Sequence, residues 1–235
     1  MHIPDGYLSP STCATLGVAM LPVWYKASAK LKQTLDVARV PQLAMGAVFA
    51  FLIMMFNVPI PNGSTAHATG AILIAIVLGP WAAVIAMSVA LVIQALVFGD
   101  GGILAIGANT FNMAFVAPFV GYGVYCFLSH HAPSGSKRQI FAAAIAAYIG
   151  LNAAAFTAAV EFGIQPLLFT APDGTPLYCP YGLEVAIPAM MLAHLTVAGF
   201  VEGTVTAVAL KFITRQAAGR IATATPMNQE GHCHE

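Results

Sequence analysis

The sequence predicts an all-α membrane protein with seven transmembrane helices, from its composition, its apolar runs and the placement of its basic residues. Of the 235 residues, 59% are hydrophobic and only 8% are charged, whereas an ordinary soluble domain carries about 25% charged residues. The mean hydropathy is +0.80, so most of the surface is expected to face the lipid bilayer. At about 20 residues a span, seven spans use about 140 residues and leave no room for a sizeable soluble domain.

Seven apolar runs, rich in Ala, Leu and Ile, are expected to form the spanning helices. They cover residues 11–25, 41–58, 66–78, 81–98, 109–128, 139–162 and 183–213. The third run is so short that, at 1.5 Å a residue, it covers only about 20 Å of a hydrocarbon core about 30 Å thick. It is therefore expected to be a short or broken helix. Gly79 and Pro80 separate it from the next run, because proline cannot continue the hydrogen-bond ladder of a helix.

The basic residues predict the orientation of the chain in the membrane. They are Lys26, Lys30, Lys32 and Arg39, then Lys137 and Arg138, then Lys211, Arg215 and Arg220. Lys and Arg are enriched in cytoplasmic loops, and seven crossings from an extracellular N-terminus put all three groups inside. Six crossings cannot do this. The C-terminus is therefore expected in the cytoplasm, and the Gly79–Pro80 break is expected to be a cytoplasmic turn.

The same patterns bound the domain organisation and exclude several functions. One transmembrane domain is expected over residues 1–215, followed by a flexible cytoplasmic tail over residues 216–235 that contains His232, Cys233 and His234. The formal net charge of zero provides no basic field for nucleic acid. The sequence holds no Gly-x-x-x-x-Gly-Lys-Ser/Thr phosphate loop, so the chain does not hydrolyse ATP by that route.

The start of the chain, Met1-His2-Ile3-Pro4-Asp5-Gly6, carries the most informative chemistry. The α-amine, the amide nitrogen of His2 and the imidazole of His2 can close two fused chelate rings in one plane around a divalent cation. A fourth nitrogen would complete a square. Square-planar nitrogen sites suit Ni(II) or Cu(II), whereas zinc prefers a tetrahedron.

His67 is the natural fourth ligand, because the predicted topology places no other histidine on the outer side. His130, His131, His232 and His234 are expected in cytoplasmic segments. The segment around His67, residues 59–70, is rich in Pro, Gly and small hydroxyl residues, which is typical of irregular backbone lining a polar cavity at membrane depth. Taken singly, each histidine is more often an incidental polar residue. Their shared side of the membrane favours a metal site.

Three stretches of the sequence closely resemble the CbiM/NikM family. They are Met1-His2-Ile3-Pro4-Asp5-Gly6-Tyr7-Leu8, residues 59–70 with Thr65-Ala66-His67, and residues 94–102 together with Gly107-Ala108-Asn109. That family comprises the substrate-capture (S) components of energy-coupling-factor importers for cobalt and nickel. The resemblance covers residues 1–215 and implies a seven-helix S component whose extracellular N-terminal segment, residues 1–8, folds back into the bundle. It also implies that the terminal amine of Met1, the amide and imidazole of His2, and His67 hold the metal.

The resemblance further implies how the protein works and with which partners. It implies a multi-pass subunit of the cell membrane that is not an enzyme and needs no catalytic cofactor. A transmembrane coupling (T) protein, two ATP-binding cassette ATPase subunits and a small accessory membrane protein are the implied partners. Nickel is the expected substrate, because Thr65-Ala66-His67-Ala68 looks like the nickel members. Co(II), which also accepts a nitrogen square, is the alternative, with uptake for cobalamin synthesis by the same mechanism.

Two other classes of function compete with this interpretation. A stand-alone channel or secondary transporter should show an ionisable relay through the bundle, where only His194 and Glu202 stand out. These residues lie about 80° apart around an α-helix, and a hydrogen-bonded structural role competes with a functional one. An intramembrane metalloenzyme needs three protein ligands, an open water position and a nearby base, whereas the expected square is filled.

Outer-side polar residues are expected to support the metal ligands, because metal-bound imidazoles usually donate their other N–H to an acceptor. The candidates are Asn62, Ser64, Thr65, Gln94, Asn109 and Asn112, and the sequence does not choose among them. Asp5 and Asp100 could attract cations to the mouth of the site. For Asp5, which precedes Gly6, an ordinary turn is the favoured interpretation.

Overall fold

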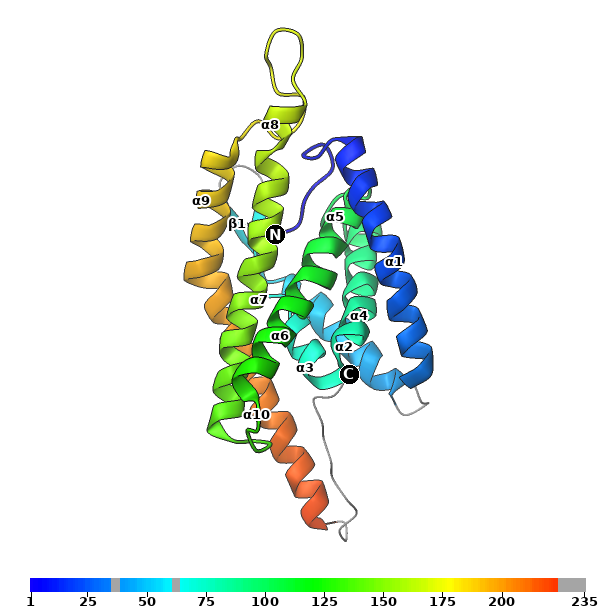
Figure 1. Cartoon of the computed structure of the whole chain (residues 1–235), viewed down its shortest axis with the longest axis vertical. Helices are drawn as coiled ribbons and strands as arrows, with labels where there is room; N and C mark the ends of the chain where they lie inside the picture. The colour runs from blue at the N-terminus through cyan, green and yellow to red at the C-terminus, as the bar shows by residue number, and fades with distance from the viewer. Residues whose placement is uncertain (35–38, 61–63, 224–235) are drawn as a thin grey trace.

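Helices follow the predicted apolar runs in the computed structural model, which describes residues 1–34, 39–60 and 64–223 (Figure 1). The first four helices are α1 (Pro10–Thr34), α2 (Val40–Met54), α3 (Ala71–Leu78) and α4 (Pro80–Ile93). The later ones are α5 (Ile106–Thr110), α6 (Ala117–Ser129), α7 (Lys137–Gly163), α8 (Gln165–Leu168), α9 (Leu183–Ala193) and α10 (Gly199–Thr223). Within the described ranges, helices lie in all seven predicted apolar runs, although the second and third runs differ in their bounds. The expected tail lies outside the described residues from residue 224 onward.

Three π-helical turns interrupt these runs. They are Gln94–Phe98 after α4, Phe111–Val116 between α5 and α6, and His194–Ala198 between α9 and α10. A π turn bonds each residue to the fifth along instead of the fourth, so it changes which residues share a face. His194 and Glu202, about 80° apart on an uninterrupted α-helix, are both 0% exposed. The turn at His194 thus lets both side chains face the interior.

The third run forms a short helix, as predicted, but it starts later than residue 66. Strands β1 (Val58–Ile60) and β2 (Ser64–Ala66) form an antiparallel hairpin in front of it. The second run likewise ends at Met54 instead of residue 58. Pro59 and Pro61 explain this, because each proline biases the residue before it toward extended backbone. The segment that contains His67 is therefore irregular backbone between β2 and α3.

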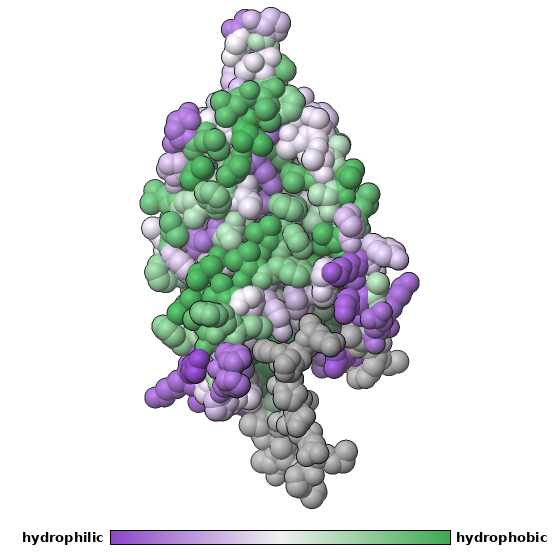
Figure 2. Space-filling model, viewed as in Figure 1, coloured by the Kyte–Doolittle hydropathy of each residue, from purple (hydrophilic) through white to green (hydrophobic). Residues whose placement is uncertain are grey.

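The hydrophobic surface fits a protein surrounded by lipid. In the described part of the chain, four helical segments are long and apolar enough to cross a membrane: Pro80–Phe98, Ile106–Ser129, Lys137–Leu168 and Leu183–Ala217. The α2 helix is a shorter apolar helix. Figure 2 shows hydrophobic residues over the middle of this face and hydrophilic residues gathered toward its lower corners. The protein is thus a mostly helical membrane protein.

Small residues let α3, α6 and α7 approach closely. The buried alanines of α7 are Ala142, Ala143, Ala146, Ala147, Ala154, Ala155, Ala158 and Ala159. At Gly121 in α6, an added Cβ would lie 2.5 Å from Ile72 Cγ1 and 3.1 Å from the carbonyl oxygen of Ala146. Backbones can pack this tightly only where the side chain is absent.

This packing predicts that Gly121→Ala lowers the thermal midpoint of unfolding in detergent. Alanine is the better helix former by about 1 kcal/mol, but overpacking a tight contact costs about 1–3 kcal/mol. Gly123→Ala is the matched control, because an added Cβ there meets nothing within 4 Å. It should leave the midpoint unchanged or raise it. Equal midpoints for the two variants would contradict the close packing of α6.

Candidate metal centre

Residues 1–9 turn back into the bundle instead of extending away from α1 (Figure 1). Met1 and Ile3 are 0% exposed and His2 is 4% exposed. The backbone of Ile3 is clamped at two points, because its N–H donates to Asn109 Oδ1 at 2.8 Å and its carbonyl accepts from Asn109 Nδ2 at 3.1 Å. The N–H of Gly102 donates to the same carbonyl at 2.8 Å. The backbone at the start of the chain is thus held deep in the protein by the Asn109 side chain and the Gly102 N–H.

Asp5 ties this segment to the loop before α5. Its carboxylate accepts hydrogen bonds from the N–H groups of Ile103 at 3.0 Å and Leu104 at 2.9 Å. A Cβ at Gly102 would lie 2.5 Å from the backbone nitrogen of Asp5, so only glycine permits this close approach. Asp5 therefore binds backbone amides of a distant loop, which goes beyond the local turn that the sequence favoured.

Helix α7 and its extension α8 hold the other end of the segment. The N–H of Ser9 donates to Gln165 Oε1 at 3.0 Å, and Gln165 Nε2 donates to the carbonyl of Glu161 at 2.9 Å. The Glu161 carboxylate accepts from Asn112 Nδ2 at 2.8 Å. Glu161 was not among the residues predicted from the sequence, although a carboxylate inside an apolar run is a signal for an important buried group.

The imidazoles of His2 and His67 stack on each other, with ring centroids 4.6 Å apart and an interplanar angle of 28°. His2 Nε2 lies 3.2 Å from Gln94 Oε1, and His67 Nδ1 lies 3.1 Å from the carbonyl oxygen of Ala68. Since both oxygens only accept, the hydrogen-bond network assigns the protons to these two nitrogens. His2 Nδ1 and His67 Nε2 then keep free lone pairs. Both are buried and have no hydrogen-bond partner in the described residues.

Asp100 lies near this pair without forming an ion pair with it. Its Oδ1 is 3.4 Å from His2 Nδ1, a contact that would count as an ion pair only with a protonated imidazole. Burial, and then the neighbouring amine, lower the pKa of His2 to about 3, so the ring is neutral at physiological pH. The half-buried Asp100 carboxyl has a raised pKa, chiefly through desolvation.

The amine of Met1 lies beside the histidines. It donates to Thr65 Oγ1 at 3.0 Å. Burial lowers its pKa from 8.0 to about 4, which leaves the nitrogen neutral with a free lone pair. Burial also lowers the pKa of His67, and a positive charge on the amine or on His2 would lower it further. The three groups are therefore packed as neutral bases, the form in which nitrogen binds a metal.

The other polar candidates divide into those at the site and those elsewhere. Ser64 Oγ donates to the carbonyl of His2 at 3.4 Å, so Ser64, Thr65, Gln94 and Asn109 all contact the N-terminal segment. Asn112 instead bonds Glu161 and Thr157. The remaining candidates, Asn62 and the tail residues His232, Cys233 and His234, lie outside the described residues.

The donor set differs from an ordinary cluster of metal-binding side chains. In residues 1–34, 39–60 and 64–223, no group of three or more His, Cys, Asp and Glu side chains is placed to hold a metal. Here two imidazoles lie beside a terminal amine and a main-chain amide. His194 is also buried, with Nδ1 2.8 Å from the Met190 carbonyl, and its Nε2 has no partner in the described part of the chain.

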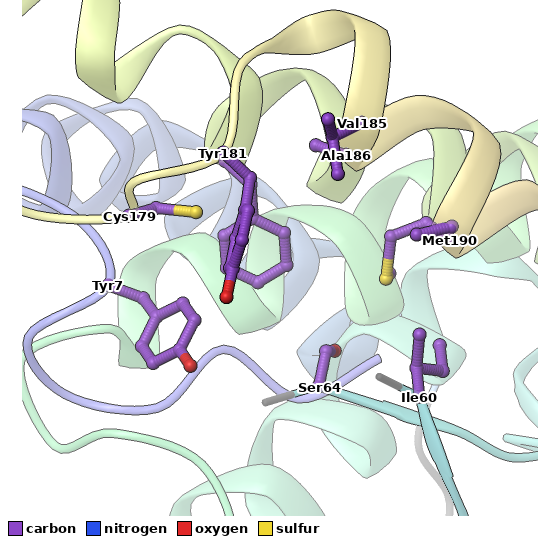
Figure 3. A pocket seen from close by; sticks show the side chains of 10 residues that line it. Tyr7, Ile60, Ser64, Cys179, Tyr181, Val185, Ala186 and Met190 are labelled. Carbon is purple, nitrogen blue, oxygen red and sulfur yellow. The ribbon is translucent and has the colours of Figure 1, made fainter. Parts of the chain in front are cut away.

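A small cavity borders the site between the N-terminal segment, the hairpin and α9. Figure 3 shows Tyr7, Tyr181, Cys179 and Met190 around it, with Ser64 at its lower side. Its volume of 20 Å³ has room for about one water molecule. The Cys179 N–H donates to the Tyr7 carbonyl at 3.0 Å, which closes one wall. Ser64, the residue that bonds the His2 carbonyl, joins this cavity to the candidate centre.

Comparison with known proteins gives the class of the protein. A solved structure of a transition metal transporter superposes with a TM-score of 0.90 at 57% identity, covering 94% of this chain and 96% of that one. A truncated transition metal transporter gives a TM-score of 0.88 at 58% identity, covering 92% and 99%. The fold is thus that of a metal-transport membrane protein.

The family follows from the sequence comparisons. Residues 2–219 match the family described as CbiM, cobalt uptake substrate-specific transmembrane region, and the chain belongs to that family. The fused nickel transport protein NikMN of Rhodobacter capsulatus is 55% identical over 215 residues, which are 92% of this chain and 62% of that protein. The cobalt transport protein CbiM of Lachnoclostridium phytofermentans is 38% identical over 127 residues, 53% of this chain and 51% of that one. This chain therefore spans less than two thirds of the Rhodobacter protein.

The clamp on Ile3 predicts that Asn109→Leu releases the N-terminal segment. Leucine removes both the acceptor and the donor, so residues 1–8 should exchange amide hydrogens faster in hydrogen–deuterium exchange. Thr110→Val is the matched control, because Thr110 is the next residue, is buried, and donates to carbonyls of its own helix at Ile106 and Gly107. Equal protection of residues 1–8 in the two variants would show that Asn109 does not anchor the segment.

Proposed function

We propose that the chain is the substrate-specific metal-capture component of an energy-coupling-factor importer and that it binds Ni(II) in a square of four nitrogens. The proposed donors are the amine of Met1, the main-chain nitrogen of His2, His2 Nδ1 and His67 Nε2. One observation carries the proposal. Two stacked, buried imidazoles each present a nitrogen that lacks a hydrogen-bond partner in the described residues, beside a buried amine.

The identity of the two free nitrogens supports this geometry. A chelate that starts at the amine and passes through the amide nitrogen of His2 can close only through Nδ1, because Nε2 lies on the far side of the ring. Gln94 occupies Nε2, which leaves Nδ1 for the metal. His67 has the complementary arrangement, with the Ala68 carbonyl on Nδ1. Such second partners fix the orientation and the tautomer of a metal-binding imidazole.

Nickel is the proposed substrate, with cobalt as the alternative. A square of nitrogens that includes a deprotonated amide requires a metal with a strong in-plane ligand field, as Ni(II) has. The Rhodobacter relative named for nickel is the more similar, and it matches nearly the whole chain. The relative named for cobalt matches about half of the chain at lower identity. The same four nitrogens would also accept low-spin Co(II).

The other subunits of the importer are proposed to be separate chains. The sequence has no phosphate-loop motif, so ATP hydrolysis is assigned to two ATP-binding cassette subunits, connected through a transmembrane coupling protein. A small accessory membrane protein completes the proposed complex. The present chain contributes a transmembrane domain over residues 1–215 in the cell membrane, with residues 216–235 as a cytoplasmic tail.

The competing functions find less support. An enzyme would need an open coordination position for water, whereas the proposed square is filled by four nitrogens. A secondary transporter would need ionisable groups that exchange protons along a path. The buried carboxylates Glu161 and Glu202 instead accept hydrogen bonds from an asparagine side chain and from backbone N–H groups.

Metal titration of the purified chain tests the proposed function. We expect one nickel ion per chain and a yellow, diamagnetic species, because a strong square field pairs the electrons of Ni(II). A tag fused in front of Met1 should weaken nickel binding more than about 100-fold, beyond the 10–100-fold typical of outer-shell changes, since it converts the amine into an amide. The same tag at the C-terminus is the control. Unchanged affinity with the N-terminal tag would exclude the amine as a ligand.

The proposed orientation has an extracellular N-terminus and a cytoplasmic C-terminus. In Figure 1 the last turn of α1 and the first turn of α7 lie at the same end of the bundle, opposite the start of α1. Lys32 lies in that last turn of α1, and Lys137 begins α7. This shared end supports the positive-inside assignment.

The orientation predicts the labelling of Lys137→Cys in a variant whose native cysteines have been replaced. Membrane-impermeant thiol reagents should not label this cysteine in intact cells. The same cysteine should react once the cells are opened. A cysteine at Asp173, in the exposed loop between α8 and α9, is the control and should react from outside. External labelling at position 137 would reverse the proposed topology.

A further inference from the structure

A carboxylate from the last long helix holds the turn that follows His67. Glu202 lies in the first turn of α10 and is 0% exposed. It accepts hydrogen bonds from the N–H of Thr69 at 2.6 Å, the N–H of Gly70 at 3.0 Å and Thr69 Oγ1 at 3.3 Å. A buried carboxylate is costly unless it is paired or hydrogen-bonded, and here the main chain of one turn supplies most of its partners.

The turn itself leaves little freedom to His67. Gly70 adopts a left-handed conformation with φ +70° in front of α3. A Cβ there would lie 2.5 Å from the Phe49 ring, so the turn is packed on its other side by α2. Helix N-termini have N–H groups without partners inside the helix and favour negative charge. Glu202 accepts from the N–H of Gly70, the residue that caps α3, and so places a carboxyl group at that helix end.

The orientation of the His67 ring depends on the same turn. The hydrogen bond from Nδ1 goes to the carbonyl of the next residue, Ala68. This bond selects the tautomer that leaves Nε2 without a proton. If the backbone at Thr69 and Gly70 moved, the Ala68 carbonyl would move with it. Both the position and the tautomer of His67 would then change.

We infer that Glu202 is a positioning residue for metal binding, which acts by holding the 67–70 turn so that His67 Nε2 faces the metal. This inference rests on the proposed function, because it takes His67 as a ligand. It also gives a role to the buried Glu202 carboxylate, which is not one of the four proposed nitrogen ligands. In Figure 1, α10 continues from α9 to the lower end of the bundle, so Glu202 ties the 67–70 turn to this long helix.

Nickel titration of the full-length Glu202→Gln variant tests the inference. Both carboxylate oxygens of Glu202 accept hydrogen bonds from Thr69 and Gly70. The glutamine side chain has one accepting oxygen, because its NH2 group can only donate. We expect a loss of nickel affinity of about 10–100-fold, as for other outer-shell changes, and an altered absorption spectrum of the bound nickel. Thr206→Val is the matched control: Thr206 is 0% exposed one turn along α10 and lies outside the 67–70 turn. It should bind nickel like the wild type.

A double-mutant cycle with His67→Ala shows whether Glu202 acts through His67. Because the turn matters only through the ligand it carries, Glu202→Gln should cost little further affinity once His67 is gone. Additive losses would overturn the inference, as would wild-type affinity and spectrum for Glu202→Gln. Failure of the wild-type chain to bind nickel would instead overturn the proposed function.

A milder variant covers the case in which Glu202→Gln does not fold. Thr69→Ala removes one donor to the carboxylate and keeps both backbone N–H groups. It should change the nickel spectrum in the same direction as Glu202→Gln, with a smaller loss of affinity. If Glu202→Gln is unfolded, wild-type affinity and spectrum for Thr69→Ala would count against the inference.

Discussion

The candidate metal centre depends on one constraint: the first residues of the chain lie inside an apolar bundle, where every polar group must find a partner. The Asn109 side chain hydrogen-bonds the backbone of Ile3, and Gln165 accepts from the N–H of Ser9. Asp5 accepts from backbone N–H groups in the loop before α5. Among these paired groups, His2 and His67 each keep one unpartnered ring nitrogen, and their rings are stacked on each other. Burial that is costly for a charged amine also keeps the amine neutral and able to bind a cation.

The sequence predicted the helical runs well, because long apolar segments in lipid have few alternatives to a helix. It predicted the boundaries around the hairpin less well, because the predicted second apolar run extends through residues 55–58 and the third starts at residue 66, although these stretches contain Asn57, His67 and Thr69. Proline restrictions end α2 early, and the left-handed turn at Gly70 sets the later start of α3. The π turns were invisible, because they arise from tertiary packing and leave no mark on an Ala-rich and Leu-rich pattern.

The sequence grouped Met1, His2 and His67 as candidate ligands, and the fold brings all three together; their role as ligands remains a proposal. The choice among the supporting polar residues needed the structure, because membership of a helix does not show which face a side chain occupies. Gln94 begins one π turn, and Asn112 lies inside another. Gln94 contacts His2, whereas Asn112 contacts Glu161. Glu161 escaped notice for a related reason: its partner Asn112 lies far away in the sequence.

The contacts of residues 1–9 also set an order of events during synthesis. This segment leaves the ribosome before the residues that hold it, which include Gln94, Asn109, Gln165 and Cys179. Contacts between residues so far apart in the sequence form late, because the intervening chain must be in place first. The first residues to be made therefore dock among the last. A partly synthesised chain that stops before Cys179 lacks one wall of the cavity beside the site, so the N-terminal segment gains its full set of contacts only after the helices up to α8 have been made.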